Sequence, residues 1–429
     1  PPRQNARRRM DESMRRVLAV LVLLTPVAGG AAVARADVTP KELSEIIAKG
    51  GGYVEKRMYD SAYRALDGFS QKHESPDVEV MKADIALKYN IRAINHEAFC
   101  FADLKEGESL SAEREKSDDR PLYVFQVSEK LGALVEKHPT HGGLRRVLGE
   151  YYYEVAMRYG DRWQKPRSEL LRLAEDNSLR ARDLKAHSHY TLFIIGTIRL
   201  GAGKHGEALD FLLESARLKG DYPPCNFNIA YAHFLNKRMK EGLPYARAAF
   251  DQYEEKGLKA ESARMAGVIL DSLGDRTASI DYYVKADALE PGNHFTLRGL
   301  MSLYLDAGVV EKADSTADSL FAIQPKNPAL PEDILSAYYR HGRKSDVLRF
   351  FDRMEARYGG DAHVLGNINF YRGKYYVYEN DPSAAAVCLG KARESFLRVF
   401  PPDHRVFGVI DAAIARMRQA EEKEQTRKK

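Results

Sequence analysis

The chain has 429 residues, of which 44% are hydrophobic, with 66 basic and 61 acidic side chains and three cysteines. The apolar fraction is ample for a buried core and excludes wholesale disorder, and so few cysteines exclude a fold built on disulfides. The mean hydropathy of −0.46 excludes a polytopic membrane protein.

The net charge of +5 belongs to the first 36 residues, which hold seven arginines and only two acidic residues. The rest of the chain is therefore neutral. A neutral body lacks the general electrostatic footprint of a nucleic-acid-binding protein, so we expect no nucleic-acid partner.

Residues 1–36 resemble an export signal and its upstream leader. A pair of arginines precedes the apolar run 17–24, and an Ala-Arg-Ala cleavage site lies at 34–36. The apolar run is short for a membrane span. We expect cleavage before Asp37, export to the bacterial periplasm or the extracellular space, and no stable membrane span afterwards; an uncleaved anchor is the alternative.

Residues 37–188 are predicted to be helical but irregular, as degenerate helical hairpins. Four stretches carry apolar residues at helical spacing: Met58–Gln71, Val78–Leu104, Leu122–Lys137 and Leu144–Tyr159. The charge-dense segment Lys105–Arg120 between the second and third stretches predicts an exposed loop.

Internal periodicity is the strongest signal in the sequence. The segment Gly274–Pro291 resembles the turn, second helix and closing proline of a tetratricopeptide repeat, and Gly267 occupies the family's small position at the helix–helix contact. Steps of about 34 residues give further units in the same register. These units start at His189, Pro223, Ala260, His294, Pro328 and, more loosely, Gly366.

The resemblance covers residues 189–400, and Leu148-Gly149 echoes the motif further upstream. It implies an all-α fold, a right-handed superhelical solenoid of antiparallel helix pairs. Small residues recur where paired helices would cross: Gly196, Ala208, Ala230 and Gly267. The helix–helix turns are expected at Gly203, Lys237, Gly274, Gly308 and Gly342. Residues 401–429 are predicted to form a capping helix, with Val406, Val409 and Ile410 on its apolar face, and a charged tail.

No cofactor or metal site is expected. The stretch Gly201–Gly206 lacks the first glycine and the final Ser or Thr of a phosphate loop. His96 with Cys100, His138 with His141, and His187 with His189 are spaced like metal ligands but lack a third ligand nearby. No nucleophile-elbow motif is present. The cysteines are expected to be buried free thiols, with one disulfide at most as the alternative: Cys100, Cys225 and Cys388.

In tetratricopeptide proteins the first helix of each repeat lines a concave groove. The resemblance therefore implies a partner-binding groove, for which exposed aromatic and arginine side chains are typical anchors. Its expected residues are Tyr190, Phe193, Phe227, Tyr231, Phe234, Arg264, Phe295 and Arg298. Further groove positions are Thr197, Val268, Asp271, Ser302, Glu332, Ser336 and Tyr339. The alternative is that the aromatic side chains pack against the preceding helices.

These patterns favour a non-catalytic scaffold of the cell envelope that binds a protein or peptide ligand in the concave groove. Two alternatives stay open: an enzyme with its active site in residues 37–188, and a binder of glycan or cell-wall polymer on the aromatic stripe. The family's chaperone-type carboxylate clamp is not conserved here. Its positions carry Phe193, Thr197, Asn228, Glu261 and Met265, of which only Asn228 fits.

Overall fold

The computed structural model describes residues 38–116 and 120–427. The expected export signal therefore lies outside the described residues. The chain divides into two compact units between Val147 and Leu148, whereas the sequence placed the start of the regular repeats at residue 189. Within the described ranges, no helix is both long and apolar enough to cross a membrane.

The first unit combines helices with a small antiparallel sheet. Its helices are α2 (Pro40–Glu55), α3 (Tyr59–Ser70), α4 (Pro76–Lys88), α5 (Leu110–Glu115), α6 (Val127–Lys137) and the start of α7 (Gly142–Tyr159). Its strands, in spatial order, are β1 (Arg92–Ile94), β2 (Ala98–Cys100) and β3 (Tyr123–Val124). The core holds the fully buried rings of Tyr63, Phe99 and Phe101.

The sheet corrects the expectation of one helical stretch over Val78–Leu104. Helix α4 ends at Lys88, and the Asn90 side chain donates to the carbonyl of Ala86. Asn95 and His96 both have positive φ, as the two central residues of a type I′ hairpin turn require. The apolar residues that follow therefore pair as strands instead of continuing the helix.

The segment Lys105–Arg120 is also more ordered than the loop we expected. It contains α5, capped by the Ser109 hydroxyl, which accepts from the Ala112 amide. Glu113 is buried and ion-paired with Arg120 at 2.8 Å. The charge density therefore reflects an internal ion pair as well as solvent exposure.

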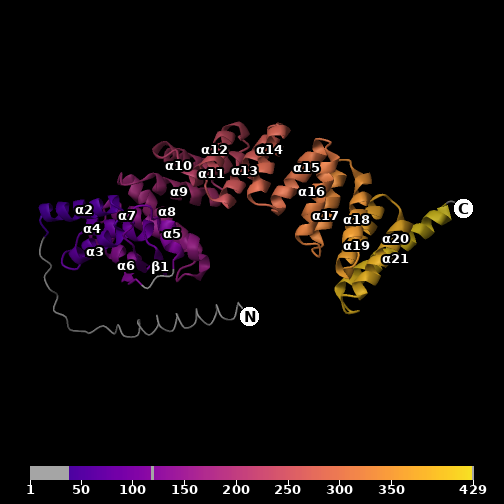
Figure 1. The fold of residues 1–429 in the computed structure, drawn as a ribbon, viewed down its shortest axis with the longest axis horizontal. Coiled ribbons are helices and arrows are strands. Elements are labelled where there is room, and N and C mark those ends of the chain that lie inside the picture. Colours follow the sequence, from indigo (N-terminus) through magenta and orange to yellow (C-terminus); the bar gives the residue numbers. More distant parts are fainter. Residues whose placement is uncertain (1–37, 117–119, 428–429) are drawn as a thin grey trace. The chain divides into compact units, whose positions relative to one another are not determined.

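The second unit is a stack of antiparallel helix pairs (Figure 1). After α7 and the 3₁₀ turn Gly160–Arg162 come α8 (Arg167–Asp183), α9 (His189–Gly201) with α10 (His205–Leu218), α11 (Pro223–Leu235) with α12 (Met239–Gln252), and α13 (Lys256–Ser272) with α14 (Arg276–Leu289). They are followed by α15 (His294–Asp306) with α16 (Val310–Ile323), α17 (Ala329–Arg340) with α18 (Lys344–Tyr358), α19 (Ala362–Tyr378) with α20 (Pro382–Leu397), and α21 (Arg405–Arg427). The predicted fold class, an all-α solenoid of helix pairs, is confirmed.

The predicted turns are confirmed residue by residue. All five have positive φ, between 59° and 84°: Gly203, Lys237, Gly274, Gly308 and Gly342. In the second of these turns, the Lys237 amide donates to the Phe234 carbonyl and the Arg238 amide donates to the His233 carbonyl. This is the Schellman arrangement, which satisfies the free carbonyls at a helix end. The chain therefore reverses at this turn while the Phe234 and His233 carbonyls stay hydrogen-bonded.

Glycines at the helix crossings let paired backbones approach closely. A Cβ atom on Gly196 would lie 2.6 Å from Leu212 Cγ, and one on Gly267 would lie 2.7 Å from Tyr283 Cδ2. The same contact occurs upstream, where a Cβ on Gly149 would lie 2.5 Å from Ser178 Oγ of α8. The α7–α8 pair therefore follows the packing rule of the repeats, although its connection is longer.

The C-terminal helix α21 covers α20 through the buried side chains of Phe407 and Ile410. Val409, which we expected on the apolar face, is 57% exposed. The reason is that it lies on the opposite side of the helix from Phe407 at 3.6 residues per turn. The three cysteines are buried free thiols, as predicted.

Two helical glycines allow a matched test of the crossings. Gly267→Ala should lower the free energy of unfolding by about 1–3 kcal/mol through overpacking against Tyr283. Gly390→Ala should raise it by about 1 kcal/mol, because Gly390 lies in α20 with open space around its Cα and alanine is the better helix former. Denaturant midpoints of the two variants should move in opposite directions; shifts of the same sign would contradict the assigned packing.

Candidate binding groove

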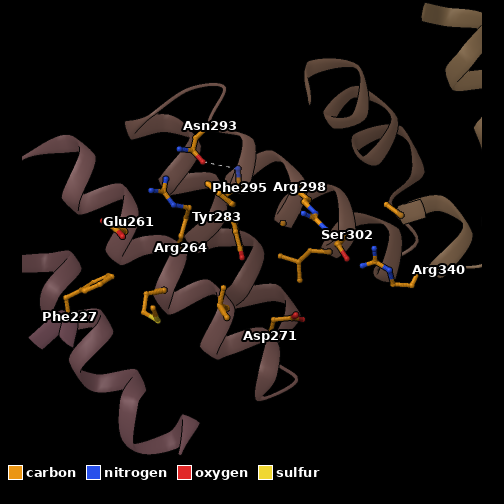
Figure 2. A pocket seen from close by; sticks show the side chains of 15 residues that line it. Phe227, Glu261, Arg264, Asp271, Tyr283, Asn293, Phe295, Arg298, Ser302 and Arg340 are labelled. Carbon is orange, nitrogen blue, oxygen red and sulfur yellow. Dashed lines mark hydrogen bonds between the residues drawn. The ribbon is translucent and has the colours of Figure 1, made fainter. Parts of the chain in front are cut away.

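A cavity of about 700 Å³ lies on the first helices of four successive pairs, α11, α13, α15 and α17 (Figure 2). Phe227 bounds it at α11 and Arg340 at α17, and Tyr283 of the second helix α14 also lines it. Its volume lies within the range of about 300–1,000 Å³ that is common for ligand sites. The four helices thus form one continuous groove, which we call the central groove.

Four of the eight expected groove residues line the central groove: Phe227, Arg264, Phe295 and Arg298. Three further first-helix positions carried over from the repeat register line it as well: Val268, Asp271 and Ser302. First-helix spacing therefore locates much of the groove wall, from α11 to α15.

The two most N-terminal expected residues are packed rather than free. Phe193 is only 6% exposed, and the rings of Tyr153 and Tyr222 meet it edge-on at centroid distances of 6.3 and 5.1 Å. Tyr190 donates a hydrogen bond to Glu154, and burial raises the pKa of its phenol. For this pair the alternative of packing against the preceding helix α7 is correct, because α7 supplies an aromatic and an acidic partner.

Tyr231 and Phe234 of α11 also lie outside the central groove. Tyr231 is 38% exposed, so it is open to solvent without lining the cavity. Phe234 is half-buried against the cluster that contains Ala230 and Ala246. The aromatic stripe expected along α9 and α11 is therefore divided between core and surface.

Phe295 is the most exposed large apolar side chain on the groove wall, at 71%. Its backbone is fixed by the Asn293 side chain, whose oxygen accepts from the amides of Phe295 and Thr296 at 3.0 and 3.2 Å. The N-cap thus holds the start of α15 in place. An aromatic ring held in solvent at the edge of a cavity is a strong candidate for a binding anchor.

The Arg264 side chain is used in hydrogen bonds within the protein. Its Nη1 donates to Glu290 Oε2 at 2.8 Å and to Thr296 Oγ1 at 3.3 Å, and its side chain is only 18% exposed. The hydrogen bond from Arg264 lowers the pKa of the Glu290 carboxyl. Arg264 therefore ties α13 to the end of α14 and the start of α15, and its charge is largely neutralised within the protein.

Ser302, His341 and Asp306 form a hydrogen-bonded chain beside the central groove. Ser302 Oγ lies 2.9 Å from His341 Nε2, and His341 Nδ1 lies 2.8 Å from Asp306 Oδ1. In the neutral tautomer with the proton on Nδ1, which donates to Asp306, Nε2 accepts from the Ser302 hydroxyl. This is the connectivity of serine hydrolases. In those enzymes backbone N–H groups often point at the oxyanion, whereas the amides around Ser302 are used within α15. These hydrogen bonds therefore connect α15 to the end of α17.

Several groove residues escaped the sequence reasoning. Arg340 follows Ser336 by one helical turn, so extending the period of α17 would have located it. Tyr283 belongs to a second helix, and it reaches the groove because Gly299 carries no side chain in its way. That contact depends on packing between neighbouring pairs and has no local sequence signal.

The first unit contains a smaller cavity, of about 310 Å³, beside a buried charge cluster. The Lys82 ammonium lies 2.8 Å from Ser70 Oγ, 2.9 Å from Asp67 Oδ1 and 3.3 Å from Glu79 Oε2, and 4.8 Å from the centre of the Phe125 ring. Two carboxylates thus surround one ammonium, which is how proteins tolerate buried charge. Across the described residues, no group of three or more His, Cys, Asp or Glu side chains is placed to hold a metal ion.

Comparison with known proteins found matches among solved structures only. No protein-family model matches the sequence, and no curated protein matches it. A solved tetratricopeptide repeat protein from Parabacteroides merdae is 17% identical, covers 63% of this chain and 98% of its own, and gives a TM-score of 0.39. YrrB, a TPR protein with an unusual peptide-binding site, is 14% identical over 54% of this chain and 96% of its own (TM-score 0.33). MamA is 14% identical, and the match covers 41% of this chain and 93% of MamA, with a TM-score of 0.33.

The Ser302 chain offers a direct test for hidden acyl-transfer chemistry. We expect no covalent labelling of Ser302 by a fluorophosphonate probe, because the site lacks backbone donors for an oxyanion. Intact-mass spectrometry of the probe-treated chain, with an authentic serine hydrolase in the same tube, measures this. Labelling that disappears in Ser302→Ala would contradict the structural interpretation and support an enzyme.

Proposed function

We propose that the chain is a non-catalytic scaffold that binds a protein or peptide segment in the central groove. The observation that carries this proposal is a cavity that runs across four consecutive first helices and exposes both Phe295 and Arg298. A ligand surface assembled from successive repeats suits an extended segment, because each pair of helices adds a similar step along the groove.

The groove wall is held in place by contacts that do not involve a ligand. Arg264, the N-cap Asn293 and the chain from Ser302 to Asp306 each fix part of α13, α15 or α17. A preformed surface loses little conformational entropy on binding. The groove therefore has the rigidity that recognition of a flexible segment requires.

A peptide suits this lining better than a glycan does. A glycan platform would present coplanar exposed rings without arginines between them. Here Phe227 lies at the α11 side of the groove, Phe295 lies on α15, and Arg298 and Arg340 follow toward α17 (Figure 2). The mixed aromatic and charged lining is the kind of surface on which peptide hot spots form.

Site-specific photo-crosslinking tests the groove. A benzoyl-phenylalanine placed at Phe295 should capture a partner in extracts of the host, whereas the same residue at Tyr378, an exposed aromatic of α19 outside the cavity, should not. Arg298→Ala should weaken binding of the captured partner by about 2 kcal/mol if it is a hot spot, as measured by calorimetry. Equal capture at both positions, with unchanged affinity in Arg298→Ala, would contradict the assignment.

We further propose that the scaffold works in the cell envelope after removal of residues 1–36. The support is the order of charged, apolar and small-residue segments in that leader. N-terminal sequencing of the chain purified from its host should begin at Asp37. Recovery of the intact leader, with the apolar run 17–24, would show that the segment serves as an anchor or is never processed.

A further inference from the structure

The charges of the central groove are segregated by helix. The acidic residues Glu261 and Asp271 lie on α13, whereas Arg298 and Arg340 lie on α15 and α17. The remaining arginine, Arg264, is neutralised by Glu290. The α15–α17 wall therefore presents net positive charge to whatever occupies the groove.

Arg298 and Arg340 both have guanidinium N–H groups that are not used in hydrogen bonds within the described residues. Arg340 is exposed, and its side chain makes no hydrogen bond or ion pair within the part of the chain that the structure describes. The Arg298 side chain is 51% exposed, and its nearest acid, Asp333, is 3.9 Å away and also lies 3.7 Å from His294. At 3.9 Å no hydrogen bond is formed. Each guanidinium can therefore still form a paired contact with a carboxylate.

Ser302 lies between the two arginines along the wall (Figure 2). Its hydroxyl is already used in the hydrogen bond with His341 Nε2. Anion recognition at this wall is thus left to Arg298 and Arg340.

The apolar part of the groove adjoins this basic wall. Phe295 is one turn from Arg298 on α15, and Met265 and Val268 of α13 line the same cavity. A ligand that placed a carboxylate at the arginines would place a neighbouring side chain against this apolar surface. The two features together describe an acidic residue with an apolar residue close to it in sequence.

We propose that the partner of the central groove is an internal acidic segment of a protein, with an Asp or Glu side chain held by Arg298 and Arg340 and an apolar side chain against Phe295. This inference rests on the proposed function and specifies its ligand. We assign the carboxylate to a side chain rather than to a chain end, because Arg298 lies inside the groove lining, with Phe227 toward α11 and Arg340 at the α17 boundary, so a segment bound at Arg298 has groove surface on both sides of it.

A peptide array tests this chemistry with the full chain. Decapeptides capped at both ends, with acidic, amide, basic and apolar residues varied at every position, are probed with the labelled protein. Asp or Glu at one position should strengthen binding by about tenfold or more over Asn or Gln, since a charge-assisted contact is worth about 1.5–3 kcal/mol. The advantage should shrink as salt is raised, because the arginines are exposed.

Charge-reversal variants assign the effect to the wall. Arg340→Glu should remove the preference for acidic peptides. Arg247→Glu, at an exposed arginine of α12 outside the cavity, should leave it unchanged. Circular dichroism confirms that both variants are folded. Equal effects of the two reversals would overturn the proposal, because they would reflect overall charge alone.

The remaining outcomes separate this inference from the proposed function. Capped Asn/Gln or basic peptides that bind as tightly as acidic ones, and that lose affinity in Phe227→Ala, would keep the peptide-binding groove and overturn the acidic assignment. Binding restricted to peptides with a free carboxyl terminus would overturn it in favour of a chain end. An array without any binding would overturn it as well, while crosslinking at Phe295 would still decide whether the groove binds a partner.

Discussion

The close approach of neighbouring helices around Tyr283 is the constraint on which the central groove depends. Its ring lies against Gly267 of α13, and a Cβ at Gly299 of α15 would overlap it. Two glycines on successive first helices therefore admit one large ring from the helix between them. The ring is buried, which raises the pKa of its phenol to about 12, and its edge forms part of the groove floor. Tyr283 therefore packs between α13 and α15 at the point where both helices line the groove.

The turns impose the complementary constraint along the chain. A residue in the left-handed region at the turn within each helix pair from α9–α10 onward reverses the backbone within a few residues. Reversal of that kind brings each second helix back along its first helix. The same side of every pair is then presented in the same direction, which is why residues about 34 positions apart can share one surface. The groove is thus a product of periodic backbone geometry, and the individual side chains only decide what it can bind.

These periodic features are what the sequence could predict. Gly203, Gly274 and their equivalents recur at steps of 34 or 37 residues, and Phe295 and Arg298 lie at first-helix positions of the same register. The features that escaped depend on contacts between residues far apart in sequence. The neutralisation of the Arg264 charge depends on an ion pair with Glu290 at the end of another helix. The burial of Phe193 depends on Tyr153 and Tyr222. In the first unit, short apolar runs fit helical and strand periods alike, so the hairpin at Asn95-His96 was indistinguishable from a continued helix.

The span of the central groove across four helix pairs has a consequence for folding. In a helical-repeat array each pair contacts its neighbours, so stability is close to a sum of local terms and segments can open separately. A ligand that touches α11, α13, α15 and α17 at once adds a coupling between pairs that do not otherwise meet. It binds only when all four are folded, so mass action stabilises them together. Occupancy would therefore merge several independently fraying segments into one cooperative unit, and hydrogen exchange would slow along the whole of α11–α18 rather than at the contact residues alone.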